Sequence, residues 1–336
     1  MYIISLRQLI LLPLFAAVAS LTGCHCGFDC GSDDDDTPAI FSLGFSDASV
    51  ESLNSVVIEV DQIVLRGDGV PDVVIDTFTI DQLDIQDAES FQVDLLDYRG
   101  RNQLTVIKEL ELERGRYSRL EISLLDNDSN FSFVEESNGL VAVLNGPAVG
   151  LSIEAFTLAS GNQAYTVEFG LAQALQRQDD DSYLLSTEGV RVENSTTSAS
   201  ITGRVASELF DTASPCDTKE DPLSGNRVYL YSGAADGSTL GDIYTAASGN
   251  SIPAGTVAPF AAATLVQNLL TGSWEYAFGY VPAGDYTLVF SCALDEDDPV
   301  DYDGLQVPLP SGQIYSISLA NAEQLQCDLA QSLSCS

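Results

Sequence analysis

The chain has 336 residues, of which 50 are acidic, 13 are lysine or arginine and one is histidine, so its formal net charge at pH 7 is −37. A negative charge of this size repels nucleic acid phosphates and anionic membrane surfaces, which excludes nucleic-acid binding. The hydrophobic content of 45% is enough to form cores, and the length predicts two domains.

An apolar run from Leu9 to Ala19 follows Arg7 near the N-terminus. The run is too short to span a bilayer, and its order of basic head, apolar core and small residues is typical of an export signal. It leads into Leu21-Thr22-Gly23-Cys24, which resembles the lipobox of bacterial lipoproteins. The resemblance implies that residues 1–23 are a lipoprotein signal peptide. Ala17-Val18-Ala19 also forms a small-x-small site, so cleavage of an ordinary secretory peptide is the alternative.

The same resemblance implies that the thiol of Cys24 is acylated and that Cys24 begins the mature protein. Two or three acyl chains give essentially permanent attachment to a membrane, whereas one does not. We therefore expect a lipid-anchored protein of the bacterial cell envelope. His25 follows the cysteine in place of the aspartate that enteric bacteria use for inner-membrane retention, which favours the outer membrane.

Residues 31–38 read Gly-Ser-Asp-Asp-Asp-Asp-Thr-Pro and contain no apolar residue that could pack. Like charges extend such a segment, so residues 24–38 are predicted to be the lipidated cysteine and a disordered acidic tether. The cysteines other than Cys24 are even in number and are disulfide candidates in an oxidising compartment: Cys26, Cys30, Cys216, Cys292, Cys327 and Cys335. Their pairing stays open.

Short segments with apolar and polar residues in alternation follow the tether, which is typical of antiparallel strands with one face in a core and one in water. Turn-forming sequences such as Asn138-Gly139 separate them. Gln173 to Arg177 favours a helical turn. The pattern predicts an all-β fold of two tandem antiparallel β-sandwich domains. The strands of the first half are expected at Phe41–Phe45, Val56–Leu65, Phe91–Leu95, Arg119–Leu124 and Tyr165–Leu171.

The first domain is predicted to span residues 39–195. The strand pattern of Phe41 to Leu65 with Ser46-Asp47-Ala48, then Val93 to Leu96, then Leu112 to Ile122 with its Gly-x-Tyr hairpin, resembles a family of bacterial envelope lipoproteins. That family is the domain of unknown function numbered 4382, and the similarity covers about residues 40 to 195. The resemblance implies an envelope location and a β-rich fold without a known activity.

Asn194 to Ser200 is polar and favours a linker, and a second series of alternating strands follows it. The Gly-x-Val of residues 203–205 and the hairpin Val281-Pro282-Ala283-Gly284-Asp285-Tyr286 resemble carboxypeptidase-regulatory-like, prealbumin-type sandwich domains. Residues 199–336 are therefore predicted to form this second domain. Its Ala-, Gly- and Ser-rich insertion, residues 234–272, is expected to be a mobile surface loop.

The residue inventory argues against catalysis. His25 is the single histidine, which excludes a Ser-His-Asp or Cys-His site in the body and zinc ligation by several histidines. We therefore predict no catalytic residues and no required cofactor. The most favourable ion site is a calcium site in one acidic loop, with the oxygen ligands Asp295, Asp297, Asp298, Asp301 and Asp303.

These features predict a lipid-anchored cell-envelope protein that acts as a non-catalytic binding or structural module. Its expected partners are the membrane, through the N-terminal lipid, and a glycan or envelope protein that contacts exposed tyrosines, Trp274 or the insertion. The alternative is an accessory or catalytic glycan-active lipoprotein that uses paired carboxylates.

Overall fold

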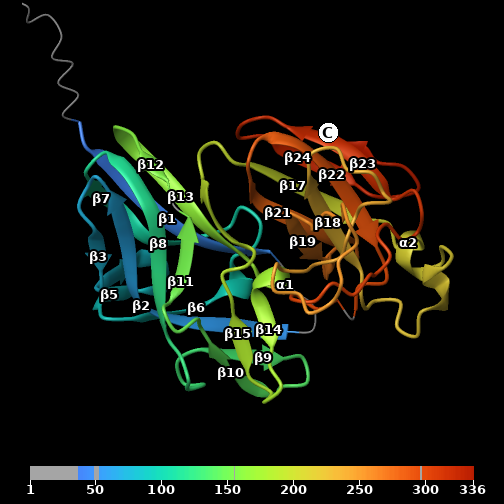
Figure 1. Cartoon of the computed structure of the whole chain (residues 1–336), viewed down its shortest axis with the longest axis horizontal. Coiled ribbons are helices and arrows are strands. Elements are labelled where there is room, and N and C mark those ends of the chain that lie inside the picture. Colours follow the sequence, from blue (N-terminus) through green and yellow to red (C-terminus); the bar gives the residue numbers. More distant parts are fainter. Residues whose placement is uncertain (1–36, 49–52, 155, 296) are drawn as a thin grey trace, which may run out of the picture. The chain divides into compact units, whose positions relative to one another are not determined.

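The computed structural model describes residues 37–48, 53–154, 156–295 and 297–336, and Thr37–Ser336 form one compact unit (Figure 1). Strands make up 51% and helices 6% of the structure, which confirms the all-β prediction. No helix among these residues is both long and apolar enough to cross a membrane. The predicted signal peptide, Cys24, Cys26 and Cys30 lie outside the described residues.

The N-terminal half contains a four-stranded sheet and a larger sheet. The four-stranded sheet has the order β16 (Val190–Asn194), β13 (Gly161–Gly170), β1 (Ala39–Ala48), β7 (Leu104–Leu112). The larger sheet follows the path β11 (Leu151–Glu154), β8 (Gly115–Leu125), β2 (Leu53–Asp68), β9 (Phe133–Glu136), β10 (Val141–Asn145), β15 (Tyr183–Leu185), β14 (Leu175–Arg177).

Short elements complete this half. β12 (Thr157–Leu158) pairs with β8, whereas β3 (Val73–Ile75) and β6 (Phe91–Asp94) pair with β2. A two-stranded sheet consists of β4 (Phe78–Ile80) and β5 (Ile85–Ala88). The helical turns are η1 (Asp81–Leu83), η2 (Leu95–Asp97) and α1 (Leu171–Ala174). The predicted helical turn thus lies earlier than expected, because residues 175–177 pair with β15 as a strand.

The two sheets enclose one hydrophobic core. Phe41, Leu43 and Phe45 of β1 are fully buried there and pack with residues of β2 and β8 from the facing sheet. This alternation is the one that the sequence predicts. Pairing is mostly antiparallel, but β1 with β13 and β10 with β15 are parallel, as are β17 (Ala199–Val205) and β24 (Gln324–Asp328) of the C-terminal half, so the sheets are mixed.

The outer face of β1 and β13 is also covered, which differs from the prediction that alternate residues face water. Ser46, Thr166 and Glu168 lie on this face, and each is at most 1% exposed. Their neighbours are residues of β21 (Trp274–Val281) in the C-terminal half. The alternation identified which residues share a face but not what lies against that face.

The C-terminal half is a second sandwich of two sheets. One sheet has the order β20 (Val266–Gln267), β21, β17 (Ala199–Val205), β24 (Gln324–Asp328), β25 (Ser334–Cys335). The other has the order β19 (Ala261–Thr264), β18 (Arg227–Ser232), β22 (Gly284–Ser291), β23 (Ile314–Leu319). Two helical turns, α2 (Glu208–Asp211) and η3 (Cys216–Thr218), follow β17. The core between these sheets includes Ile201, Leu230, Phe278 and Phe290.

The insertion at residues 234–272 is not the separate surface loop that its composition predicts. It supplies strand β19, whose four residues are all buried, and the buried side chains of Leu240 and Ile243. These side chains pack with Tyr229 and Tyr231 on the outer face of the second sheet. Small residues allow this part of the chain to approach the tyrosine rings closely. Other parts of the insertion, including residues 249–251, 253–255 and 269–272, are exposed to solvent.

The two halves contact each other through a close backbone approach. A Cβ on Gly279 would lie 2.0 Å from the carbonyl oxygen of Gly100, so the approach requires glycine. Beside it, the hydroxyl of Tyr280 donates to the carbonyl of Arg101 (3.1 Å), and the Arg101 guanidinium lies 5.3 Å from the centre of the Tyr280 ring. On the same side, Arg191 lies 4.4 Å from the ring centre of Phe260. These contacts explain why the halves form one compact unit.

Two disulfides link cysteines of the C-terminal half, Cys216 with Cys292 and Cys327 with Cys335. Cys216 and Cys292 are buried between the sheets, whereas the second bridge joins β24 to β25 at their paired positions. The sequence identified these four cysteines as candidates, and the fold decides their pairing.

Candidate functional site

The acidic loop predicted to bind calcium lies between β22 and β23. Its carboxylates accept hydrogen bonds from the loop's own backbone and from the insertion. Asp298 Oδ1 accepts from the amides of Val300 (2.7 Å) and Asp301 (3.1 Å), and Asp303 Oδ2 accepts from the amide of Asp298 (2.9 Å). Asp301 Oδ1 accepts from the amide of Gly249 (2.6 Å). These hydrogen bonds to its aspartates stabilise the conformation of the loop. Asp295 takes no part in these bonds and is exposed.

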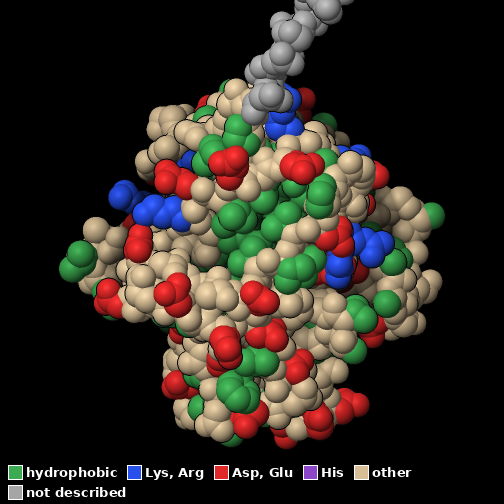
Figure 2. Space-filling view, turned by 90° about the vertical axis from the view of Figure 1, so that its left-hand side faces the viewer, with side chains coloured by type: hydrophobic (Ala, Val, Ile, Leu, Met, Phe, Trp, Pro, Cys, Tyr) green, Lys and Arg blue, Asp and Glu red, His purple; other side chains and the backbone are tan. Residues whose placement is uncertain are grey.

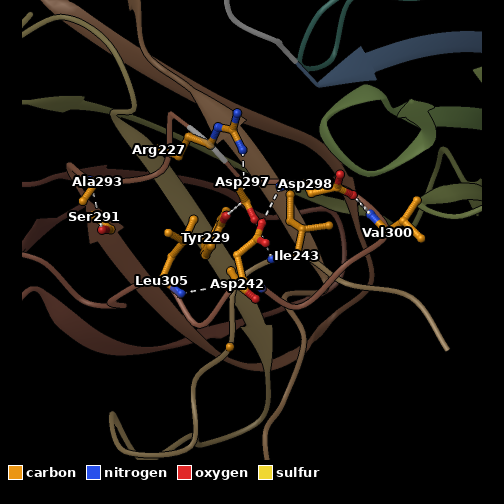
Figure 3. A network of polar contacts seen from close by, with 12 residues as sticks. Arg227, Tyr229, Asp242, Ile243, Ser291, Ala293, Asp297, Asp298, Val300 and Leu305 are labelled. Carbon is orange, nitrogen blue, oxygen red and sulfur yellow. Dashed lines mark hydrogen bonds and ion pairs between the residues drawn. The ribbon is translucent and has the colours of Figure 1, made fainter. Parts of the chain in front are cut away.

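Asp297 is the buried member of the loop and the centre of a polar network (Figure 3). Its side chain is 0% exposed, and Oδ2 lies 2.9 Å from Nη1 of Arg227. The hydroxyl of Tyr229 donates to the same oxygen, and the amide of Ile243 donates to Oδ1 (3.2 Å). Burial raises the pKa of Asp297 to about 6, although Arg227 opposes this rise.

Asp242, from the insertion, is the second buried carboxylate of the network. Oδ2 accepts from the amides of Leu305 (2.8 Å) and Asp303 (3.1 Å), and Figure 3 shows the side chain between the two loops. Burial, together with the nearby charge of Asp303, raises the pKa of Asp242. Asp242 and Asp297 thus join the insertion to the acidic loop, and strand β18 supplies the balancing cation.

The five predicted calcium ligands do not converge. Among the residues that the structure describes, no three histidine, cysteine, aspartate or glutamate side chains are grouped so that they could hold a metal ion. The guanidinium of Arg227 already pairs with the carboxylate of Asp297, so a metal ion would have to compete with Arg227 for this carboxylate. Calcium binding by Asp295, Asp297, Asp298, Asp301 and Asp303 therefore stays a prediction without a ligand set in the described chain.

Paired carboxylates for glycan chemistry are the alternative, and two arrangements meet that description only in part. Asp242 and Asp297 are close and buried, but backbone amides, Tyr229 and Arg227 occupy them. Asp179 and Asp180 line an open pocket, yet hydrogen bonds from Ser182 lower the pKa of Asp180. A general acid needs a raised pKa instead. The pKa is raised at Asp242 and Asp297, but their oxygens are occupied by protein groups, whereas the pKa of Asp180 is lowered.

A pocket of about 380 Å³ lies on the outer face of the sheet that contains β17 and β21. We call it the β17–β21 pocket. Its side chains come mainly from these two strands and from β24, and Arg99 reaches it from the segment after η2 of the N-terminal half. The lining residues are Arg99, Thr202, Gly203, Arg204, Val266, Glu275, Tyr276, Ala277 and Gln326. The volume is within the range of small-molecule sites.

The tip of the β20–β21 hairpin, residues 268–273, lies next to this pocket in the chain. Leu269 and Leu270 are 90% and 97% exposed. Asn268 orders the turn, because its Oδ1 accepts from the amides of Leu270 (3.0 Å) and Thr271 (3.2 Å). Its Nδ2 donates to Glu275 Oε1 (3.2 Å). An ordered turn therefore exposes two adjacent leucine side chains to solvent. We call this turn the leucine tip.

Hydrophobic side chains also gather on the face of the N-terminal half that Figure 2 shows, where they fill a hollow bordered by acidic side chains. Strands β3, β5 and β7 lie on this side. Their residues Val73, Ile75, Ile85 and Leu110 are half-buried and pack against the core. This surface is continuous with the core of the first sandwich.

The remaining predicted features are dispersed. Trp274 is half-buried and packs edge-to-face against Phe210, 5.8 Å between ring centres. The sequence did not identify the leucine tip or the convergence of Arg99 with Arg204. Two adjacent leucines before Thr271-Gly272 were the sequence signal for the tip. No sequence pattern indicates that Arg99 and Arg204 line one pocket.

Comparison with known proteins agrees with the first-half architecture. Residues 38–187 match the model of the family described as Domain of unknown function (DUF4382). The family match and the sequence resemblance begin at nearly the same residue. The match ends at residue 187, about one strand before the end of the resemblance near residue 195. It does not reach residues 199–336, where the likeness to prealbumin-type domains stays a prediction. No curated protein matches the chain.

Solved structures give distant likenesses. A leucine-rich repeat protein from Bacteroides thetaiotaomicron is 12% identical with a TM-score of 0.22, covering 86% of this chain and 25% of the other. The TIE protein of Bacillus anthracis is 7% identical with a TM-score of 0.18, covering 86% and 33%. The major pilin subunit of Bacillus cereus is 10% identical with a TM-score of 0.19, covering 83% and 60%. The chain thus spans from a quarter to three fifths of these proteins, at TM-scores too low to show a shared fold.

Proposed function

We propose that the protein is a lipid-anchored module of a bacterial cell envelope that binds a partner protein through the leucine tip and performs no catalysis. The observation that carries the proposal is the exposure of Leu269 and Leu270 on an ordered turn. Single exposed hydrophobic residues are normal on protein surfaces, but an adjacent pair at a projecting turn is typical of a contact site. The lipobox-like sequence ending in Cys24 supports the anchor and the envelope location.

Burial of the tip against a partner is energetically sufficient for recognition. Burying an exposed leucine side chain gains about 1.5–3 kcal/mol, so two leucines supply a small hot spot. The turn is already ordered by Asn268 and by the bond from the Gly272 amide to the Asn268 carbonyl (2.7 Å), so little conformational entropy is lost on binding.

The leucine tip is tested by a photo-crosslinking amino acid at position 270 of the full chain on intact cells. We expect a discrete crosslinked species that disappears when Leu269 is changed to Ser, while the unfolding free energy changes by less than about 0.5 kcal/mol. The matched control carries the crosslinker at Val149, which is 81% exposed in the other half of the chain. Equal crosslinking from both positions, or none from position 270, contradicts the proposal.

The anchor is tested by metabolic labelling with a clickable fatty acid. We expect the wild type to be labelled and to sediment with membranes, and Cys24→Ala to lose both properties, because acylation of the thiol supplies the attachment. A Cys26→Ala control keeps a cysteine at position 24 and is expected to behave as the wild type. An unlabelled wild type, or a membrane-bound Cys24→Ala, would overturn the anchor.

A further inference from the structure

The β17–β21 pocket brings positive charge together on a strongly acidic molecule. The net charge of −37 repels anions at a distance, but this repulsion is screened over about 8 Å at physiological ionic strength. A local pair of guanidinium groups then decides whether an anion binds. Arg99 and Arg204 come from different halves of the chain and line the same pocket.

A backbone carbonyl orients Arg99, and Asp94 is close enough to feel its charge. Its Nε donates to the carbonyl of Leu96 (2.7 Å), which holds the guanidinium in place. No carboxylate in the described parts of the chain forms an ion pair with it, although the chain has 50 acidic residues. An arginine held by a backbone carbonyl keeps its terminal amino groups for a ligand.

Arg204 is only weakly paired. Its Nε lies 3.9 Å from Oε1 of Glu275, at the limit of an ion pair. That same oxygen accepts hydrogen bonds from Ser273 Oγ (2.8 Å) and from Asn268 Nδ2 (3.2 Å). Glu275 is therefore held by the hairpin, and Arg204 remains able to bind another carboxylate.

The strand register places the other polar groups in one row. Thr202 lies opposite Ala277 of β21 and Gln326 of β24, and Arg204 lies opposite Glu275. β17 is an interior strand between β21 and β24, whereas β20 pairs with only Trp274 and Glu275 of β21. A ligand on this face meets side chains of β17, β21 and β24. The small side chain of Ala277 leaves room between the polar groups.

We infer that the β17–β21 pocket binds a uronic acid residue of an acidic polysaccharide, which goes beyond the partner-protein role proposed for the leucine tip. The carboxylate of the sugar pairs with Arg99 and Arg204, for which the planar guanidinium fork is suited. Its ring hydroxyls exchange hydrogen bonds with Thr202, Gln326 and Glu275. An acidic peptide is the competing ligand, because arginine clusters also recognise acidic motifs, and triglutamate represents it in the experiment.

Isothermal titration calorimetry of the detergent-solubilised full chain tests the inference with trigalacturonate, its methyl ester and triglutamate. We expect trigalacturonate to bind and the uncharged ester to bind at least about tenfold more weakly, because the ester keeps the hydroxyls but loses the ionic hydrogen bonds. Arg99→Gln and Arg204→Gln should each weaken trigalacturonate binding about tenfold. Arg119→Gln, which removes the same charge from an exposed arginine on β8, should leave the affinity within about twofold.

Three results overturn the inference: no binding of trigalacturonate, equal binding of its ester, or equal effects of Arg119→Gln and Arg204→Gln. Tighter binding of triglutamate than of trigalacturonate would assign the pocket to acidic peptides instead and overturn the sugar. If trigalacturonate fails while crosslinking from the leucine tip succeeds, only the sugar inference falls. If crosslinking fails while trigalacturonate binds at Arg99 and Arg204, the partner-protein role falls and the pocket stands.

Discussion

Replacing Arg227 by Met is expected to lower the unfolding free energy by about 3–5 kcal/mol at pH 8, because it leaves the carboxylate of Asp297 buried without its cation. Arg227 is 13% exposed and Asp297 is 0% exposed, so water cannot replace the lost partner. Tyr229 and the amide of Ile243 still donate to the carboxylate but carry no charge. Urea unfolding followed by circular dichroism measures the loss.

The loss should depend on pH. The pKa of Asp297 is about 6 with Arg227 present, and Arg227 lowers it. Removing the arginine raises the folded-state pKa further above the unfolded value, so the penalty is small at low pH and grows as the pH rises through the folded-state pKa. Arg227→Met should therefore be less damaging at pH 5 than at pH 8.

Two variants serve as controls for Arg227→Met. Arg204→Met removes an arginine with a 57% exposed side chain and should change stability by less than about 0.5 kcal/mol. Asp297→Asn in the Arg227→Met background removes the unpaired charge and should recover a large part of the lost stability. A loss below about 1 kcal/mol at pH 8, or one that does not vary with pH, would refute the role assigned to this pair.

Replacing Glu168 by Gln is expected to stabilise the protein at pH 8 by up to about 3 kcal/mol, because glutamine is neutral at every pH. Glu168 is 1% exposed between the two halves, and burial raises its pKa to about 7 from 4.5. Arg191, the hydroxyl of Ser46 and the amide of Gly279 oppose this rise, while Glu193 adds to it. A tenfold change in the proton affinity of the carboxylate corresponds to about 1.4 kcal/mol of unfolding free energy.

The sign follows from linkage. Because the folded-state pKa of Glu168 is above the unfolded value, its protonated form stabilises the fold below pH 4.5, and this contribution is lost as the pH rises through 7. The difference in unfolding free energy between Glu168→Gln and the wild type should therefore grow from near zero at pH 4.5 to its maximum at pH 8.

Urea unfolding of both proteins over this pH range measures the difference. Glu111→Gln, an exposed change on β7 of the same sheet, controls for the loss of one acidic residue from an acidic protein and should change stability by less than about 0.5 kcal/mol. Arg191 keeps Glu193 as an ion-pair partner in the variant (3.4 Å), so no new buried charge is left unpaired. A difference that stays flat with pH, or a variant less stable than the wild type at pH 8, would contradict the expectation.

Local alternation accounts for most of the fold prediction. Phe41, Leu43 and Phe45 alternate with small or polar residues and are buried where the pattern requires. The predicted strand Val56–Leu65 lies within β2. The prediction for the insertion is wrong because its Ala-rich segment has a low intrinsic tendency to form sheet. Pairing with β18 and packing on both faces make it a strand.

The disulfides and candidate sites also show which features the sequence predicts and which the fold decides. Sequence alone determined the all-β class, the candidate disulfide cysteines and the lack of a histidine-based catalytic site, since these depend on residue inventory and on periods of two. Only the tertiary structure decided that Cys216 pairs with Cys292, that Asp297 takes Arg227 as its cation, and that Arg99 and Arg204 line one pocket. These arrangements involve residues that are far apart in the chain. The strand order brings them together, and that order depends on how whole sheet faces are covered. No local sequence pattern encodes it.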